Sequence, residues 1–327
     1  MVSKTILSVR NLAVNFYTYR GVVKALDGVD FDVKRGEQIG LVGETGCGKT
    51  VTALSVMKLV PPPGRIVSGH ILFNGVDLVS LTEEEMNKVR GRKISMIFQD
   101  PLSHLNPVYK IGEQIADVIM LHQKLEGRRR NIKKNALKKA IEALKLVKMP
   151  EPEVIANKYP HELSGGMRQR VLIAMAISCN PELLIADEPT TALDVTVQAH
   201  ILDLLKDLKK KLNLTVLFIT HDLGIVAQTC ERVAVMYAGC VVEVASTRKI
   251  FKNPLHPYTK GLLEAIPKLH EEKFLKPIPG SIPDLINPPR GCRFHPRCKC
   301  SLDKCRFAKP EMLEVEEGHY VACHKWR

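Results

Sequence analysis

The stretch GETGCGKT at residues 43–50 constrains the fold of this 327-residue chain more than any other feature. It fits the spacing G-x-x-x-x-G-K-[ST], which is typical of a loop that binds the phosphates of a nucleotide. A strand-like apolar segment precedes it at residues 37–43, and an apolar helical segment follows at residues 51–60. Loop amides and the helix N-terminus attract phosphate, Lys49 can reach the β- and γ-phosphates, and the Thr50 hydroxyl can ligate Mg²⁺. The sequence therefore predicts a site for a nucleoside triphosphate between a strand and a helix.

A second apolar segment, LLIADEPT at residues 183–190, contains two adjacent acids. Continuous apolar runs are typical of buried strands in a parallel sheet, and ligands collect at the carboxyl ends of such strands. Asp187 is placed to hold Mg²⁺ through water, and Glu188 is placed to polarise an attacking water. Either acid alone could be an ordinary surface residue. Both together, in a chain with a phosphate loop, indicate a catalytic role.

The stretch LSGGMRQRV, which begins at Leu163, opens a further apolar helical segment. Ser164 is a good N-cap, and Gly165 and Gly166 leave backbone amides uncovered, so this helix start is a second anion site. One nucleotide does not need two such sites within one chain. We therefore expect a dimer in which the second site of each subunit closes on the γ-phosphate held by the other.

Taken together, these stretches resemble the ATP-binding subunits of ABC transporters over roughly residues 4–250. GETGCGKT resembles the Walker A motif of that family, IFQD with Gln99 its Q-loop, LSGGM its signature and LLIADE its Walker B motif. TALD at residues 191–194 resembles its D-loop, and FITHD with His221 its switch motif. The resemblance implies an α/β fold of the ABC-type P-loop NTPase class, with a RecA-like core, an antiparallel β part and an inserted helical subdomain at about residues 101–180. Apolar residues at helical spacing in GEQIADVIMLHQKL and ALKKAIEALKLV agree with that subdomain.

The resemblance also implies a role for each matched residue. Gln99 would contact Mg²⁺ and the attacking water, and His221 would stabilise the γ-phosphate. Phe16 is expected to stack on adenine, with Tyr19 as the alternative. The residues expected to contact the nucleotide are Phe16, Tyr19, Gly43, Glu44, Thr45, Gly46, Cys47, Gly48, Lys49, Thr50, Val51, Ser164, Gly165, Gly166 and Asp194; those expected to hold Mg²⁺ are Thr50, Gln99 and Asp187.

Cys47 lies inside the phosphate loop, beside Lys49 and at the start of a helix. Both neighbours favour a thiolate. We therefore expect a lowered pKa and a reactive thiol, against the alternative of a small residue that is merely tolerated there.

Two further stretches narrow the family. DPLSHLNPVYKIGEQI at residues 100–115 and NPLHPYTKGLLEAIP at residues 253–267 resemble the branch that imports peptides and nickel. This implies that ATP hydrolysis energises the import of dipeptides or oligopeptides, with nickel or another small solute as the alternative. The implied partners are two transmembrane permease subunits, a second and different ABC ATPase subunit and, indirectly, an extracytoplasmic solute-binding protein. The implied location is peripheral, on the cytoplasmic face of the inner membrane.

Charge and hydropathy bear on two other classes of protein. The net charge is +13, and the basic run GRRRNIKKNALKKA at residues 127–140 would suit nucleic acid. Only 5% of the residues are aromatic, which argues against a stacking platform, and the run lies in the expected helical subdomain. A solvated or membrane-facing helix is the better interpretation, so we expect no nucleic acid partner; a soluble ABC ATPase acting on nucleic acid is the alternative. No apolar run approaches the ~20 residues of a membrane span, and we expect no signal peptide.

The C-terminal stretch GCRFHPRCKCSLDKC at residues 291–305 is dense in cysteine, and Cys323 follows it. A reducing cytoplasm disfavours disulfides and makes a metal site the better interpretation. The importer branch carries matching cysteines, which implies a [4Fe–4S] cluster, while Cys300 departs from the branch pattern. Zinc also suits four thiolates, and nearby histidines keep a mixed zinc site open. The expected ligands are Cys292, Cys298, Cys305 and Cys323, and the histidines are His295, His319 and His324.

These patterns divide the chain into an ABC ATPase domain at residues 4–254 and a small cysteine-rich C-terminal extension at residues 255–327. Residues 276–289 (KPIPGSIPDLINPP) predict an extended connector without helix or strand. Residues 268–327 are rich in proline and charge, so we expect this segment to bury too little apolar surface to order itself. A metal site would supply the missing constraint.

Overall fold

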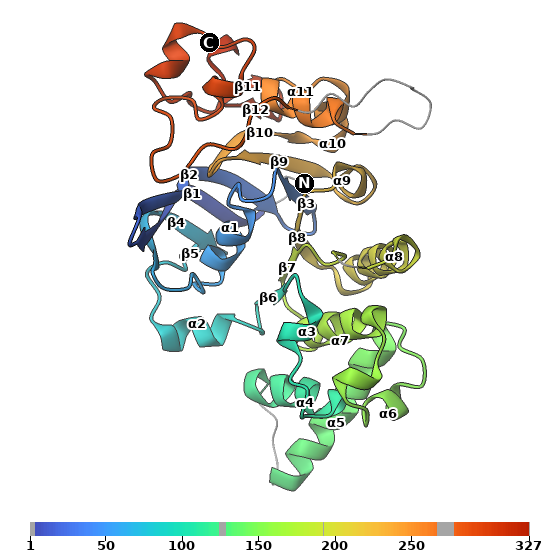
Figure 1. Ribbon diagram of the computed structural model, residues 1–327. Coiled ribbons are helices and arrows are strands. Elements are labelled where there is room, and N and C mark those ends of the chain that lie inside the picture. The colour runs from blue at the N-terminus through green and yellow to red at the C-terminus, as the bar shows by residue number, and fades with distance from the viewer. Residues whose placement is uncertain (1–3, 124–128, 192, 267–277, 327) are drawn as a thin grey trace. The chain divides into compact units, whose positions relative to one another are not determined.

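The computed structural model describes residues 4–123, 129–191, 193–266 and 278–326 (Figure 1). The chain forms two compact units. The first unit consists of residues 1–80 and 218–327, and the second of residues 81–217. Strand β8 (Thr215–Thr220) crosses the division between them. The C-terminal extension therefore belongs to the same compact unit as the phosphate loop.

The first unit contains an antiparallel sheet with the strand order β2-β1-β4-β5. Alternate residues of β1 are fully buried, as the period of two along a strand requires, and a register shift between Val9 and Leu12 carries the alternation across an irregularity. The strands are β1 (Thr5–Thr18), β2 (Gly21–Lys34), β4 (Gly64–Phe73) and β5 (Val76–Asp77). This sheet is the antiparallel β part that the family resemblance implies.

A second set of strands in the first unit has the order β11-β12-β10-β9-β3. Its strands are β3 (Gln38–Val42), β9 (Arg232–Tyr237), β10 (Cys240–Ser246), β11 (Leu313–Glu316) and β12 (His319–Val321). Strand β3 pairs in parallel with β9, and all five of its residues are buried, as expected for the strand that leads into the phosphate loop. The helices of this unit are α1 (Lys49–Val56), α9 (Leu223–Thr229), α10 (Thr247–Lys252) and α11 (Pro257–Glu264).

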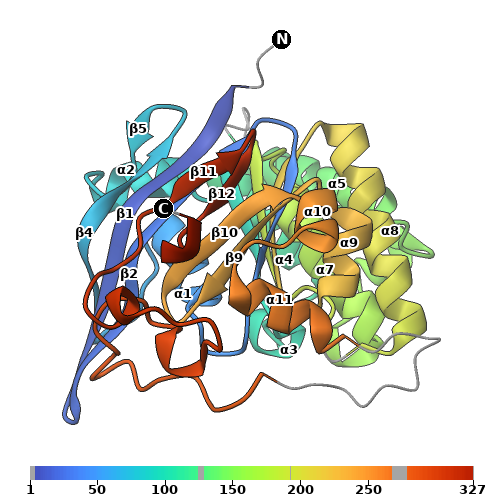
Figure 2. The ribbon, with the colours of Figure 1, turned by 90° about the horizontal axis from the view of Figure 1, so that it is seen from above.

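The C-terminal extension joins this sheet. Strands β12 and β11 lie beside β10, with Glu243 opposite Val321 in an antiparallel pair (Figure 2). Phe294 and Ala322 of the extension are also buried. Residues 278–289 contain neither helix nor strand, as predicted for the part of the connector that the structure describes. The extension thus gains order from the sheet of the first unit, which its proline-rich and charged composition did not predict.

The second unit combines two parallel strands with a group of helices. Every residue of β6 (Ile94–Ile97) and β7 (Leu183–Asp187) is buried, and Ile97 lies opposite Ala186. Helices α4, α5 and α7 contact one another, and α4 and α5 fall in the two stretches with predicted helical spacing. The helices are α2 (Glu83–Val89), α3 (Pro101–His104), α4 (Ile111–His122), α5 (Arg129–Leu146), α6 (Pro152–Ile155), α7 (Gly165–Ile177) and α8 (Val195–Leu212).

Helix α5 contains the described part of the basic run. Ala136 and Ala140 are fully buried, whereas Lys133 is exposed and its Nζ lies 3.2 Å from Oε1 of Glu113 on α4. This arrangement is that of a solvated helix face, as the sequence predicts. Residues 127 and 128 of the run lie outside the described residues. None of the described helices combines the length and the apolar character that a membrane span requires.

A buried carboxylate joins the extension to the sheet. Glu243 of β10 is fully buried, and its side chain accepts hydrogen bonds from the amides of Leu255 and His256 at 2.7 and 2.9 Å. Nε2 of His319 on β12, also fully buried, donates to the same carboxylate at 2.7 Å. One side chain therefore holds the start of α11 and the strand β12 in place.

We predict that Glu243→Ala lowers the free energy of unfolding by about 3–5 kcal/mol, because it leaves three buried donors without their acceptor. Urea denaturation measures the loss, and hydrogen exchange shows whether residues 313–321 lose protection first. The matched control is Glu317→Ala at an exposed position between β11 and β12, which we expect to change stability by no more than about 0.5 kcal/mol. Equal stability of the two variants would contradict the role of Glu243.

Candidate active site

The phosphate loop lies between β3 and α1 and takes a backbone path that requires glycine. Gly43 has φ 157°, and a Cβ there would lie 2.1 Å from the carbonyl oxygen of Met236. Gly48 has φ 108°, and a Cβ there would lie 3.1 Å from the carbonyl oxygen of Ala25. Only a residue without a side chain fits these two positions. Thr45, Gly46 and Thr50 are exposed, so the crest of the loop is open to a ligand within this unit.

Lys49 lies inside the curl of this loop. Its side-chain ammonium donates to the carbonyl oxygens of Gly43 and Glu44 at 2.8 and 3.1 Å. The residue is only 5% exposed. Backbone carbonyls therefore hold a buried positive charge in the centre of a loop built from amides, which suits a phosphate group.

Cys47 differs from its prediction. The residue is fully buried, and burial raises the pKa of its thiol despite the opposing effects of Lys49 and of nearby backbone amides. The prediction of a lowered pKa is therefore wrong. The physical reason for the raised pKa is that the Cys47 side chain points into the loop, where a Cβ at Gly43 would lie 2.8 Å from Sγ. Desolvation outweighs the attraction of the neighbouring charge.

In the second unit, the structure brings Gln99 and Glu188 together. Oε2 of Glu188 accepts hydrogen bonds from Nε2 of Gln99 at 3.1 Å and from the hydroxyl of Thr191 at 2.9 Å. Glu188 follows β7 directly and has φ 46°, an uncommon value for a side chain of this size that turns it out of the strand direction. Asp187, the last residue of β7, is 2% exposed. The two acids at the end of one strand thus occupy different environments.

The signature stretch and the D-loop also meet in the second unit. Ser164 caps α7, its hydroxyl accepting from the amide of Met167 at 3.4 Å, and Asp194 caps α8 by accepting from the amide of Val197 at 2.9 Å. A Cβ at Gly166 would lie only 2.6 Å from Val197. Both helix starts therefore lie side by side, with Ser164 exposed.

His221 and the aromatic candidates belong to the first unit. His221 is exposed and precedes α9, whose first amides are capped by Asp222 at 2.7 and 3.2 Å. Phe16 on β1 is half-buried and packs closely on the backbone of Gly64, where a Cβ would lie 2.6 Å from its ring. Tyr19 is 91% exposed in the turn between β1 and β2. Both residues therefore stay candidates for the adenine contact, Phe16 with a packed ring and Tyr19 with a solvent-exposed ring.

The four predicted cysteine ligands gather in the extension. Burial raises the pKa of Cys292 to about 12, and the nearby thiols of Cys305, Cys323 and Cys298 add to the rise. The amide of Cys292 also donates to the carbonyl oxygen of Cys305 at 2.9 Å. Cys300 is exposed. Within the described ranges, however, no group of three or more histidine, cysteine, aspartate or glutamate side chains has the arrangement of a metal site.

The three histidines near these cysteines all have other partners. Nδ1 of His295 lies 2.9 Å from the carbonyl oxygen of Cys292, and Nε2 of His324 lies 2.8 Å from that of Ala308. His319 binds the buried carboxylate of Glu243. Each contact uses one ring nitrogen, and a metal-bound histidine commonly makes such a contact with its other nitrogen, so these contacts do not choose between an all-thiol and a mixed donor set.

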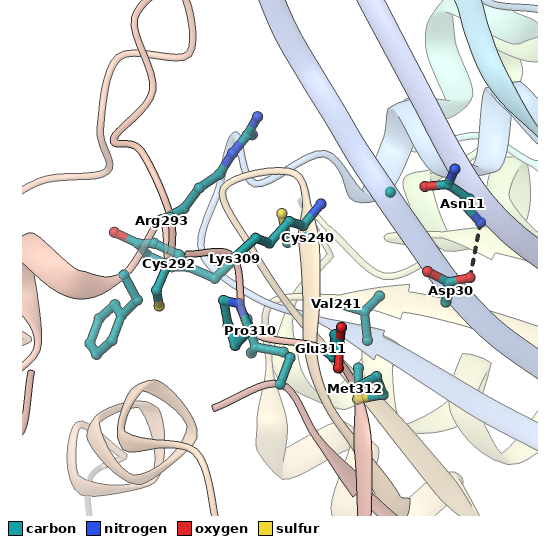
Figure 3. Close-up of a pocket in the computed structure, with 16 residues that line it drawn as sticks. Asn11, Asp30, Cys240, Val241, Cys292, Arg293, Lys309, Pro310, Glu311 and Met312 are labelled. Atoms are coloured by element: carbon teal, nitrogen blue, oxygen red, sulfur yellow. Dashed lines mark hydrogen bonds between the residues drawn. The ribbon is translucent and has the colours of Figure 1, made fainter. Parts of the chain in front are cut away.

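A cavity of about 350 Å³ lies in the first unit beside the cysteine stretch (Figure 3). Cys240, Cys292, Arg293 and Lys309 line part of it. The cationic groups of Arg293 and Lys309 each lie 3.3 Å from the carboxylate of Asp27, which balances part of their charge. The cavity could not be predicted from the sequence, because its lining residues come from distant segments that share no motif.

Sequence patterns also missed two contacts of the phosphate loop. Tyr258 of α11 and Arg297 of the extension both bind Glu44. Tyr258 lies in the stretch that marked the importer branch, and Arg297 lies between two of the predicted cysteine ligands. Neither stretch has a spacing that points back to residues 43–50. The available signal was weak: Tyr258 and Arg297 are strong hydrogen-bonding residues, and each lies in a stretch that stands out for another reason.

Known proteins share these features. Residues 26–191 match the ABC transporter family, and residues 242–305 match the C-terminal region of oligopeptide/dipeptide transporters. Over 319 residues the chain is 52% identical to the oligopeptide transport ATP-binding protein OppD of Bacillus subtilis, which covers 97% of this chain and 87% of that protein. It is 50% identical over 325 residues to the probable peptide ABC transporter ATP-binding protein y4tR of Sinorhizobium fredii, covering 98% and 95% of the two chains.

A solved structure shows the same fold. The dimeric structure of MJ0796, a bacterial ABC transporter cassette, is 28% identical in sequence and has a TM-score of 0.65, covering 74% of this chain and 99% of that one. The predicted ABC ATPase fold with a C-terminal extension is confirmed. Its matched motifs and its half-identical relatives establish that the chain belongs to the ABC transporter family, as an ATPase of the oligopeptide/dipeptide transporter group.

Proposed function

We propose that this ATPase energises the import of oligopeptides or dipeptides through an ABC transporter. The observation that carries the proposal is that the similarity continues beyond the nucleotide motifs, because residues 242–305 match the C-terminal region of oligopeptide/dipeptide transporters. Relatives named for oligopeptide transport and for dipeptide transport are 52% and 48% identical to the chain. Nickel or another small solute is the alternative cargo.

The first unit would bind the nucleotide. Loop amides of residues 43–51 and the ammonium of Lys49 would hold the β- and γ-phosphates, and His221 would stabilise the γ-phosphate. Phe16 would stack on adenine, with Tyr19 as the alternative. Mg²⁺, when bound, would neutralise the phosphate charge, and the chain offers the Thr50 hydroxyl as a ligand for it.

The second unit would supply the groups that act on water. Glu188 would take a proton from the attacking water. Gln99 donates to the Glu188 carboxylate at 3.1 Å and would orient both this carboxylate and the water. Gln99 and the buried Asp187 are the further candidates for holding Mg²⁺. Ser164, Gly165, Gly166 and Asp194 would contact the nucleotide held by a second ATPase subunit, because their helix starts lie side by side and Ser164 is exposed.

The assembly would contain two transmembrane permease subunits and a second, different ABC ATPase subunit, fed by an extracytoplasmic solute-binding protein. The chain would lie at the cytoplasmic face of the inner membrane as a peripheral subunit and would not bind nucleic acid. Reconstituting the complex in vesicles tests this. We expect ATP-dependent uptake of labelled di-, tri- or longer peptides, and competition by nickel instead of by peptides would overturn the peptide assignment.

We also propose that the four gathered cysteines hold a [4Fe–4S] cluster, with zinc as the alternative. Four thiolates suit either group. The proximity of Cys292 to Cys298, Cys305 and Cys323 supports the proposal, because a tetra-thiolate site needs four such side chains together. The ligands would be Cys292, Cys298, Cys305 and Cys323, with Cys300 outside the set.

We predict that Glu188→Gln retains ATP affinity and loses at least about 100-fold in hydrolysis rate, because a general base contributes that much or more. Phosphate release by the reconstituted transporter and ATP binding measure the two effects. Glu142→Gln on α5, an exposed acid of the same unit, is the matched control and should hydrolyse ATP at the parent rate. A rate for Glu188→Gln within about threefold of the parent would contradict the assignment of the base.

For the cysteines, we predict about four iron atoms per chain and broad absorption near ~400 nm in anaerobically purified protein. Cys298→Ser should lower the iron content and make residues 278–326 sensitive to protease, because a bound cluster would help to order this segment. Cys300→Ser should change neither property. One zinc per chain and no iron in protein made with ample iron would refute the cluster and support zinc.

A further inference from the structure

Glu44, the second residue of the phosphate loop, is bound by two parts of the C-terminal extension. Its carboxylate forms a bidentate ion pair with Arg297, with distances of 2.7 Å from Nη1 to Oε2 and 3.0 Å from Nη2 to Oε1. Its amide donates to the hydroxyl of Tyr258 at 2.9 Å. The extension thus fixes both the side chain and the main chain of one loop residue.

Several contacts hold the guanidinium of Arg297 in one position. Its Nε donates to the carbonyl oxygen of Pro279 at 2.9 Å, and Nη2 lies 3.3 Å from that of Ile278. The group also lies over the ring of Tyr237, 5.7 Å from its centroid, and the side chain is only 6% exposed. A buried, planar group with this many partners has lost its conformational freedom before any nucleotide arrives.

Tyr258 is held with similar rigidity. It is fully buried, and its ring packs against Tyr237 of β9 and Phe294 of the extension, with centroid distances of 4.6 and 5.4 Å. Burial lowers the pKa of His256 to about 3, and the neutral ring caps α11 by accepting from the amide of Tyr258 at 3.0 Å. The hydroxyl therefore stands on a fixed aromatic cluster.

The contacts of Glu44 continue to the residue that reaches the phosphates. The carbonyl oxygen of Glu44 accepts from Nζ of Lys49 at 3.1 Å and from the amide of Cys47 at 3.2 Å. A carboxylate in a loop that binds phosphates would repel them if its charge were not balanced. Arg297 balances that charge at the distance of a direct ion pair.

We propose that the C-terminal extension sets the affinity of the phosphate loop for ATP: Arg297 neutralises and orients Glu44, while Tyr258 fixes the main chain that holds Lys49. Both are positioning residues, since they act through Glu44. The inference rests on the proposed ATP site. It assigns to the extension a task that is separate from metal binding and from contact with a partner.

The test measures the Kd of MgATP for the full-length chain by calorimetry, together with the melting temperature. We expect about tenfold weaker binding for Arg297→Met, within the range of coupling between sites, and about fivefold weaker binding for Tyr258→Phe, the equivalent of one lost hydrogen bond. The double variant Arg297→Met with Glu44→Gln should return to within about threefold of the parent, because the unbalanced carboxylate is gone. Arg306→Met, an exposed arginine of the extension, is the matched control and should bind as the parent does.

A purely structural arginine would not be rescued by removing the charge of Glu44, so rescue separates the two roles. Parental affinity in Arg297→Met, or a double variant no better than the single one, would overturn the proposal. If Arg297→Met melts well below the parent, the affinity of Tyr258→Phe decides between the two roles, because this variant keeps the ring packing. Lys49→Ala tests the ATP site itself: if the parent binds MgATP and this variant does not, the site stands whatever Arg297 does.

Discussion

The backbone path of the phosphate loop is the constraint on which the first unit depends. Two glycines with positive φ let the chain pass under the carbonyl oxygen of Met236 on β9 and beside that of Ala25 on β2. The loop therefore packs against one strand from each sheet of this unit. The same β9 pairs with β10, which in turn carries β12 of the extension. Because these strands are neighbours, residues from distant parts of the sequence contact the phosphate loop at residues 43–50.

Local spacing made much of the fold and of the site predictable. The phosphate loop, the cap at Ser164, and the buried strands β3 and β7 each depend on residues close together in the sequence. Helices α4 and α5 followed from their apolar period. Where one short stretch contains both the residue type and its structural context, the sequence is enough.

Contacts between distant segments could not be predicted in this way. Arg297 and Glu44 are 253 positions apart, and no pattern in either stretch pairs them. The raised pKa of Cys47 depends on how tightly the loop closes over its thiol, which charge and position in the sequence do not reveal. The short strands β11 and β12 alternate polar and apolar residues over too few positions to stand out, and only pairing with β10 makes them strands.

The place of β12 beside β10 has a consequence for solubility. Without it, the long and almost wholly buried β10 would present a row of unpaired amides and carbonyls, a template on which another chain could add a strand. The extension moves the free border of the sheet to β11, which has only four residues and carries the exposed acids Glu314 and Glu316. A short border with charged side chains is a poor template for a second copy. With the extension in place, the sheet thus ends in an edge that is less open to edge-to-edge aggregation than β10 would be.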